Sequence, residues 1–154
     1  YVTLVAMVLD HTRHTLTVVN AGHPSPKRHR AATGALADLL ATDAGGPPLG
    51  WNRDYPYTAV TVALEPNDTV TAFTDGVSEA LSPHGALFGD AAVARCLTPA
   101  PLSAPDPGRP TAVGSNLRNA VYKHLGSRPQ TDDIAIVSFG RWDPESDHQT
   151  TVMH

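Results

Sequence analysis

The sequence predicts an α+β fold, because extended runs fill the first half of the chain and helical patterns the second half. Residues 69–74 alternate polar and apolar side chains, as a strand with one buried face does. Residues 112–125 instead space their apolar side chains as on one face of a helix. At 154 residues and 41% hydrophobic content, the chain can bury one core, so we expect a single domain.

Most of the expected strands are joined by short turns. Six runs are predicted to pair as three antiparallel hairpins, namely 1–9 with 15–20, 26–30 with 35–40, and 57–64 with 69–74. The last pair has the clearest signal, because Pro66 fixes the backbone for a type I turn and Asn67 and Asp68 can bond the local backbone. A seventh run, 134–139, follows near the end of the chain.

Two helices are expected in the second half. The first covers residues 91–97 with Asp90 as its N-terminal cap, and the second covers 112–125 with Gly126 as its stop. The apolar face of the second helix should pack on a sheet. Five prolines between residues 98 and 110 argue against regular structure, so this stretch is predicted to be a mobile surface loop.

The charge distribution argues against a nucleic-acid partner. The formal net charge is -4, and the only basic cluster is Lys27-Arg28-His29-Arg30. We interpret this cluster as the solvated part of an edge strand or hairpin, and a contact with an acidic partner or phosphopeptide stays open as the alternative.

Cysteine and histidine usage also limits the possible functions. The single cysteine, Cys96, sits on an apolar helix face and fits a small buried hydrophobe better than a nucleophile. His11 and His14 lie in a hairpin loop without a Cys partner, so no dedicated zinc site is expected. With no apolar run near 18 residues and no visible signal peptide, we expect no membrane span and a cytoplasmic protein.

Acidic residues stand where two of the predicted strands end or begin. Asp75 follows directly on residues 69–74, and Asp132 and Asp133 directly precede residues 134–139. Two central strands could therefore present carboxylates at one rim of a sheet. Oxygen ligands suit hard cations such as Mg²⁺ or Mn²⁺, and water held by such ions attacks phosphate esters readily.

Five short motifs extend this pattern along nearly the whole chain. In order, they are Asn20-Ala21-Gly22-His23-Pro24, Gly46-Pro47-Pro48-Leu49-Gly50, Thr74-Asp75-Gly76-Val77-Ser78-Glu79-Ala80, Leu87-Phe88-Gly89 and Asp132-Asp133-Ile134. Each is weak alone, but their order and spacing resemble the SpoIIE/RsbU-like sporulation branch of the metal-dependent PPM protein phosphatases. The resemblance spans residues 1–141.

This resemblance implies a fold and a reaction. The fold is a sandwich of two antiparallel sheets flanked by helices, with a dinuclear Mn²⁺ or Mg²⁺ centre in the cleft between the sheets. In this family a metal-activated water attacks phosphoserine or phosphothreonine directly, so no side chain is expected to act as the catalytic nucleophile. The usual substrates in this branch are anti-sigma factor antagonist proteins.

The resemblance also assigns roles to single residues. Asp75 and Asp132 match the family's metal-binding acids, and Asp133 is better placed to orient the site or the substrate, because adjacent strand residues point to opposite faces. Supporting roles near the site are expected for Gly76, Asn20, His23 and Glu79. Two alternatives stay open: His23 as a local turn residue before Pro24, and the Asp132-Asp133 pair as a solvated strand entry that caps backbone groups.

One part of the family pattern does not occur in this chain. Family members carry earlier Gly-Asp and Asp-x-x-Gly-His-Gly segments, whose Asp bridges both metals. We therefore expect an N-terminal portion of the domain to be missing, and the start at Tyr1, within a strand and without Met, also suggests that residues once preceded it. Two carboxylates are too few for two ions, so the 154 residues alone should be inactive or very weak.

These expectations define the domain and its partners. Residues 1–141 are predicted to be a partial SpoIIE/RsbU-like phosphatase domain, and residues 142–154 a polar tail without order. An exposed sheet edge left by the missing strands invites homodimerisation. Two functions stay open: a phosphoprotein phosphatase, or a non-catalytic phosphatase-like module that binds a regulatory partner.

Overall fold

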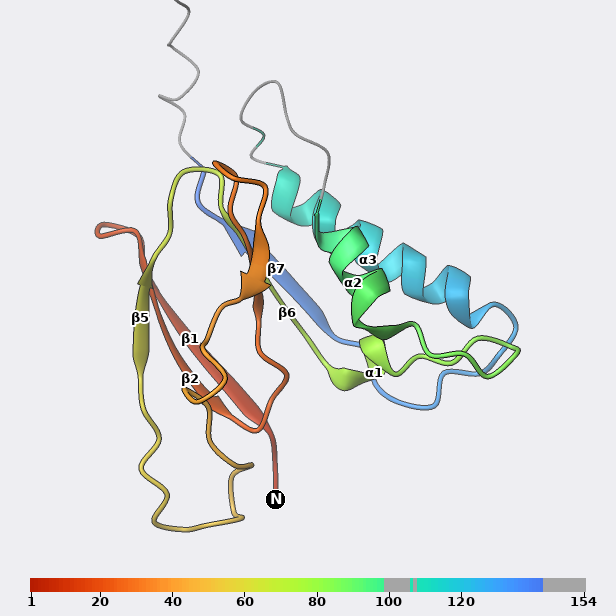
Figure 1. The fold of residues 1–154 in the computed structure, drawn as a ribbon, viewed down its shortest axis with the longest axis horizontal. Helices are drawn as coiled ribbons and strands as arrows, with labels where there is room; N and C mark the ends of the chain where they lie inside the picture. Colours follow the sequence, from red (N-terminus) through yellow and green to blue (C-terminus); the bar gives the residue numbers. More distant parts are fainter. Residues whose placement is uncertain (99–105, 107, 143–154) are drawn as a thin grey trace, which may run out of the picture.

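The computed structural model describes residues 1–98, 106 and 108–142, and the predicted α+β class is confirmed (Figure 1). Its elements in chain order are β1 (Leu4–Asp10), β2 (Thr15–Ala21), β3 (Lys27–His29), β4 (Leu36–Asp38), β5 (Val60–Ala63), β6 (Thr69–Phe73), α1 (Asp75–Ser78), α2 (Gly89–Leu97), α3 (Arg109–Leu125) and β7 (Ile136–Gly140).

The strands form two antiparallel sheets that face each other. One sheet has the order β1-β2-β5 and the other the order β4-β3-β6-β7. The helices α2 and α3 lie beside β6 and β7, on the side away from the three-stranded sheet (Figure 1). This arrangement is the sandwich with outer helices that the resemblance implied. In the described residues, the helices cover the outer face of the four-stranded sheet.

Two apolar clusters hold these layers together. The first fills the space between the sheets and includes Leu16 and Val18 of β2 and Val70 of β6, each with 0% exposure. The second joins the four-stranded sheet to the helices. Its α3 members recur every four residues, at Val113, Leu117, Val121 and Leu125. Since β6 contributes to both clusters, all five of its residues are buried.

The predicted pairing of residues 57–64 with 69–74 is wrong. The turn between them forms, with the Asp68 amide donating to the Glu65 carbonyl at 3.1 Å. However, β5 pairs with β2, and β6 pairs with β3 and β7. The chain therefore crosses from one sheet to the other at this turn, a choice that the local turn chemistry does not determine.

The basic cluster at residues 27–30 was also misjudged. It lies in a hairpin, as predicted, but β3 is an inner strand between β4 and β6. Arg28 is 8% and His29 3% exposed. The Arg28 guanidinium can be buried because it forms an ion pair with Asp68 across 40 sequence positions.

Both long helices begin earlier than predicted. Helix α2 starts at Gly89 with Phe88 at the cap position, so Asp90 does not cap it but lies in its first turn, where a negative charge favours the helix dipole. Helix α3 starts at Arg109 and holds Pro110 in its first turn, where proline costs no hydrogen bond. Of the predicted mobile loop, residues 99–105 and 107 lie outside the described residues. Residues 143–154 of the predicted tail also lie outside them.

Candidate functional site

The two acidic motifs meet at one end of the four-stranded sheet. Strands β6 and β7 run antiparallel, with Phe73 opposite Ile136. Asp75 opens α1 two residues after the end of β6, and Asp132 and Asp133 precede β7, so residues almost 60 positions apart come to the same rim. The prediction of two central strands holds only for β6, because β7 is the outer strand of this sheet.

Backbone and side-chain contacts join the two acidic segments tightly. The Thr74 amide donates to the Ala135 carbonyl at 3.1 Å. The Thr74 hydroxyl donates to the Asp133 carbonyl at 2.7 Å and accepts from the Ala135 amide at 3.0 Å. Gly76 lies so close that a Cβ built on it would be 2.5 Å from the Asp133 carbonyl oxygen. Only glycine fits this approach without displacing the backbone of the second segment.

A cavity of about 310 Å³ opens beside this junction. Gly76, Glu79 and Asp132 line it, together with apolar side chains that include Leu87. Neither Asp75 nor Asp133 is among its lining residues. Glu79 ends α1, with its amide donating to the Asp75 carbonyl at 2.8 Å. The cavity therefore places Glu79 and Asp132 at one opening.

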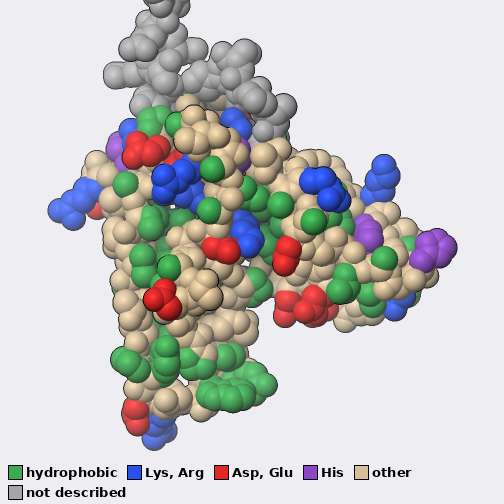
Figure 2. Space-filling model, viewed as in Figure 1, with side chains coloured by type: hydrophobic (Ala, Val, Ile, Leu, Met, Phe, Trp, Pro, Cys, Tyr) green, Lys and Arg blue, Asp and Glu red, His purple; other side chains and the backbone are tan. Residues whose placement is uncertain are grey.

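The carboxylates here have no basic partner in the part of the chain that the structure describes. Asp75 accepts a hydrogen bond from the Gly76 amide at 3.0 Å, and Asp132 accepts one from the Asp133 amide at 2.8 Å. Both acids are exposed, and acidic side chains gather over the region of α1 (Figure 2). Exposed carboxylates without a neutralising Lys or Arg suit a hard divalent cation.

These acids provide only part of a metal-binding site. Within residues 1–98, 106 and 108–142, no three side chains of His, Cys, Asp or Glu come together as a metal-binding group. Mg²⁺ asks for near-octahedral oxygen coordination. Asp75 and Asp132 therefore fit as two ligands of a larger set, and they do not make a two-ion centre by themselves.

Asn20 and His23 lie at a different cavity, of about 380 Å³. The Asn20 amide nitrogen donates to the His23 carbonyl at 2.8 Å, and the His23 amide donates to the Asn20 side-chain oxygen at 2.9 Å. The His23 ring nitrogen Nδ1 lies 2.9 Å from the Pro24 carbonyl. These bonds close a local turn, the open alternative for His23, and the residues do not line the cavity beside Asp132.

The five motifs thus form two separate groups. The motif at residues 20–24 packs on the motif at 46–50, since the Gly46 amide donates to the Asn20 carbonyl at 3.0 Å. The motif at 87–89 lies with the two acidic motifs, at 74–80 and 132–134, because the Phe88 amide donates to the Ala80 carbonyl at 2.8 Å. We call these three motifs the acidic group. Residues far apart in sequence therefore converge within each group.

Sequence reasoning missed two residues of the acidic group. Gln130 donates a side-chain hydrogen bond to the Asp132 carbonyl at 2.7 Å, and Gln130 and Thr131 both line the cavity. Their position directly before Asp132 was the available signal. A polar residue beside a candidate ligand often holds the ligand's loop in place.

Comparisons with known proteins cover most of the chain. A model of the family described as stage II sporulation protein E (SpoIIE) matches residues 1–142. Protein IcfG of Synechocystis sp. is 28% identical over 141 residues, which are 92% of this chain and 21% of IcfG.

No helix in the described ranges has the length and apolar character to cross a membrane.

Two solved structures share the fold. The SiaA-PP2C domain of Pseudomonas aeruginosa matches with a TM-score of 0.67 and 25% identity, over 92% of this chain and 52% of that chain. The phosphatase domain of the cell fate determinant SpoIIE from Bacillus subtilis matches with a TM-score of 0.65 and 17% identity, over 96% of this chain and 60% of that chain. The chain therefore spans a fifth to three fifths of the lengths of these relatives.

Proposed function

Because the chain belongs to the SpoIIE family, as the predicted resemblance to PPM-type phosphatases indicated, we propose that it forms part of a metal-dependent protein serine/threonine phosphatase. Metal dependence is general among phosphatases of the SpoIIE and PP2C type. The proposed reaction is hydrolysis of phosphoserine or phosphothreonine in a protein substrate. Residues 1–141 are proposed to be a partial phosphatase domain of this kind.

One observation carries this proposal. Asp75 and Asp132, from the third and fifth motifs, lie on two segments that hydrogen-bond to each other, and neither carboxylate has a basic partner within the described ranges. Carboxylate oxygens are the ligands that Mg²⁺ and Mn²⁺ prefer. A rim of the sheet that carries both acids can therefore contribute to a site for such an ion.

The residues of this chain have distinct parts in the proposed reaction. Asp75 and Asp132 would hold Mn²⁺ or Mg²⁺, and the bound ion would supply an activated water and charge stabilisation. Gln130 and the Asp133 amide form hydrogen bonds within the segment of Asp132. The two segments meet where the Asp133 carbonyl accepts from the Thr74 hydroxyl and lies close to Gly76. Glu79 faces the adjoining cavity, where it can contact the substrate.

The exposure of the site suits a phosphorylated side chain on a protein. Asp75 and Asp132 are both exposed, so a phosphoryl group on a protein surface can reach them. We propose a cytoplasmic phosphoprotein substrate, and an anti-sigma factor antagonist as its class. The outer strands β1 and β7 also leave sheet edges unpaired in the described residues, which supports the proposal of a homodimer.

The incomplete ligand set keeps a second function open. Two carboxylates are too few to hold two ions in octahedral geometry, so the 154 residues alone are expected to release phosphate very slowly or not at all. The alternative function is a non-catalytic phosphatase-like module, in which the same surface would bind a regulatory partner.

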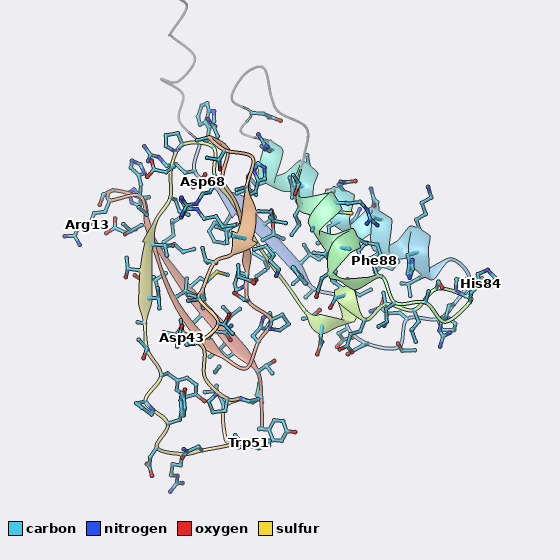
Figure 3. All side chains as sticks on the ribbon, viewed as in Figure 1. Arg13, Asp43, Trp51, Asp68, His84 and Phe88 are labelled. Carbon is cyan, nitrogen blue, oxygen red and sulfur yellow. The ribbon has the colours of Figure 1, made fainter. Side chains whose placement is uncertain are left out.

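The decisive test is Mn²⁺-dependent release of phosphate from a phosphoserine peptide by the full-length protein that contains this chain. The Asp75→Asn variant should lower the rate by about 100-fold or more, because several kcal/mol of charge stabilisation are lost. Asp43→Asn is the matched control, since Asp43 is also exposed but lies away from α1 (Figure 3).

The outcomes separate the two functions. Equal rates for Asp75→Asn and the unaltered protein would remove the catalytic assignment. Absence of any phosphate release, together with retained binding of a phosphoprotein, would favour the non-catalytic module.

A further inference from the structure

Thr74 makes contacts that its position does not require. It occupies the N-cap position of α1, where a Thr hydroxyl ordinarily accepts a hydrogen bond from the first turn of the helix. In this protein the hydroxyl makes no cap hydrogen bond. It bonds instead to the segment that carries Asp132, 59 and 61 positions further along the chain.

The Thr74 hydroxyl uses both its donor and its acceptor capacity on that segment. It donates to the Asp133 carbonyl at 2.7 Å and accepts from the Ala135 amide at 3.0 Å. The Thr74 amide adds a third bond, to the Ala135 carbonyl at 3.1 Å. The hydroxyl therefore extends the pairing of β6 and β7 beyond the last strand pair, Phe73 with Ile136.

Both acids are bonded closely to this junction. Asp75 directly follows Thr74 in the chain, and the Asp132 side chain accepts a hydrogen bond from the Asp133 amide, whose carbonyl Thr74 binds. Gly76, which has no Cβ, allows the same carbonyl to lie close to α1. Movement of the Thr74 hydroxyl would therefore change the separation of the two carboxylates.

We propose that Thr74 is a positioning residue, whose hydroxyl holds the loop of Asp132 beside Asp75 so that both carboxylates face one divalent cation. The proposal rests on the proposed metal-dependent function and adds a residue that sets the geometry of the site. A side chain that orients a metal ligand commonly changes metal affinity by about 10- to 100-fold when it is removed.

The test compares variants that differ in the hydroxyl and little else. Thr74→Val keeps the branched shape and removes the hydroxyl, whereas Thr74→Ser keeps the hydroxyl. Thr17→Val is the matched control, because the Thr17 hydroxyl bonds Thr61 in the other sheet, at 2.9 Å. Mn²⁺ affinity of the full-length protein is measured by isothermal titration calorimetry, and hydrogen exchange of the Ala135 amide is measured without metal.

The expected result is a loss of Mn²⁺ affinity of about 10- to 100-fold in Thr74→Val, with Thr74→Ser and Thr17→Val within a few-fold of the unaltered protein. The Ala135 amide should exchange faster in Thr74→Val only. If Thr74→Val does not fold, Thr74→Ala replaces it, since alanine removes the hydroxyl without adding volume.

The outcomes distinguish this proposal from the proposed function. Unchanged Mn²⁺ affinity in Thr74→Val, with affinity lost in Asp75→Asn, would overturn the positioning role and leave the metal site intact. An equal loss in Thr74→Val and Thr74→Ser would also overturn it, because the hydroxyl would not be the cause. Affinity unaffected by Asp75→Asn would remove the metal site itself.

Discussion

The two ends of β6 carry an aspartate each, and the two are treated in opposite ways. Asp68, just before the strand, is 1% exposed and accepts hydrogen bonds from Arg28, the Ala31 amide and the Glu65 amide. Asp75, just after the strand, is exposed and accepts one bond, from the Gly76 amide. Asp68 and α1 lie at opposite ends of the strand (Figure 3).

The difference separates a structural acid from a candidate ligand. The oxygens of Asp68 are satisfied by donors of the protein, so this carboxylate stabilises the crossing between the sheets and has little capacity left for a ligand. Asp75 has free acceptor capacity and no basic neighbour in the described part of the chain. An exposed acid with free acceptor capacity is the one available to a cation.

The largest expected effect is on Asp68. Asp68→Asn should lower the free energy of unfolding by about 3–5 kcal/mol, because the Arg28 guanidinium would stay buried without a counter-charge. Asp75→Asn should change it by less than about 0.5 kcal/mol. Urea unfolding of both variants measures the contrast, and similar losses for both would show that the two ends of β6 are not different in kind.

A second, smaller effect is expected at Gly76. Gly76→Ala forces a methyl group against the Asp133 carbonyl and should cost about 1–3 kcal/mol of unfolding free energy. Gly45→Ala is the matched control, because no atom lies within 4 Å of a Cβ built there. Equal stability of the two variants would mean that the acidic segments can separate at little cost.

Stability should also depend modestly on pH through His29. Burial, and next the nearby Arg109, lower the pKa of His29 below its ordinary value of 6.5, while Asp68 acts in the opposite direction. The unfolded chain therefore binds the proton more readily, so stability present above pH 6.5 is lost as the pH falls below it.

Urea unfolding between pH 7 and pH 5 measures this dependence. The slope with pH should decrease in His29→Gln and persist in His11→Gln, since His11 is exposed in the first hairpin loop. An unchanged slope in His29→Gln would assign the dependence to other groups.

A small effect is also expected for the second ion pair of β3, which lies at the surface. The Lys27 ammonium lies 2.5 Å from the Asp38 carboxylate, whose side chain is 52% exposed. Asp38→Asn should cost at most about 1 kcal/mol, because solvent screens an exposed pair. Urea unfolding of Asp38→Asn and Asp68→Asn compares an exposed and a buried ion pair formed by adjacent residues of β3. If Asp38→Asn lost as much unfolding free energy as Asp68→Asn, burial would not explain the difference between the two pairs.

Much of the local structure could be predicted from sequence. The first two hairpins and the spacing of the α3 core residues follow from short-range periodicity and turn chemistry. The partners of β5 and β6 could not, because a turn with Pro66 and Asn67 fits a hairpin and a crossing between sheets equally well. The burial of Arg28 was missed for a similar reason, since its counter-charge lies 40 positions away.

The sequence by itself determined which side chains are available: the acids of residues 75 and 132, the motifs that mark the family, and the elements that flank them. Only the tertiary structure decided which acid is neutralised, which strand each run joins, and that the Thr74 hydroxyl bonds the Asp133 and Ala135 backbone. The physical reason is the sequence separation over which each kind of interaction acts. Dihedral preferences act over a few residues, whereas ion pairs and hydrogen bonds depend on atoms that the fold brings together from distant positions.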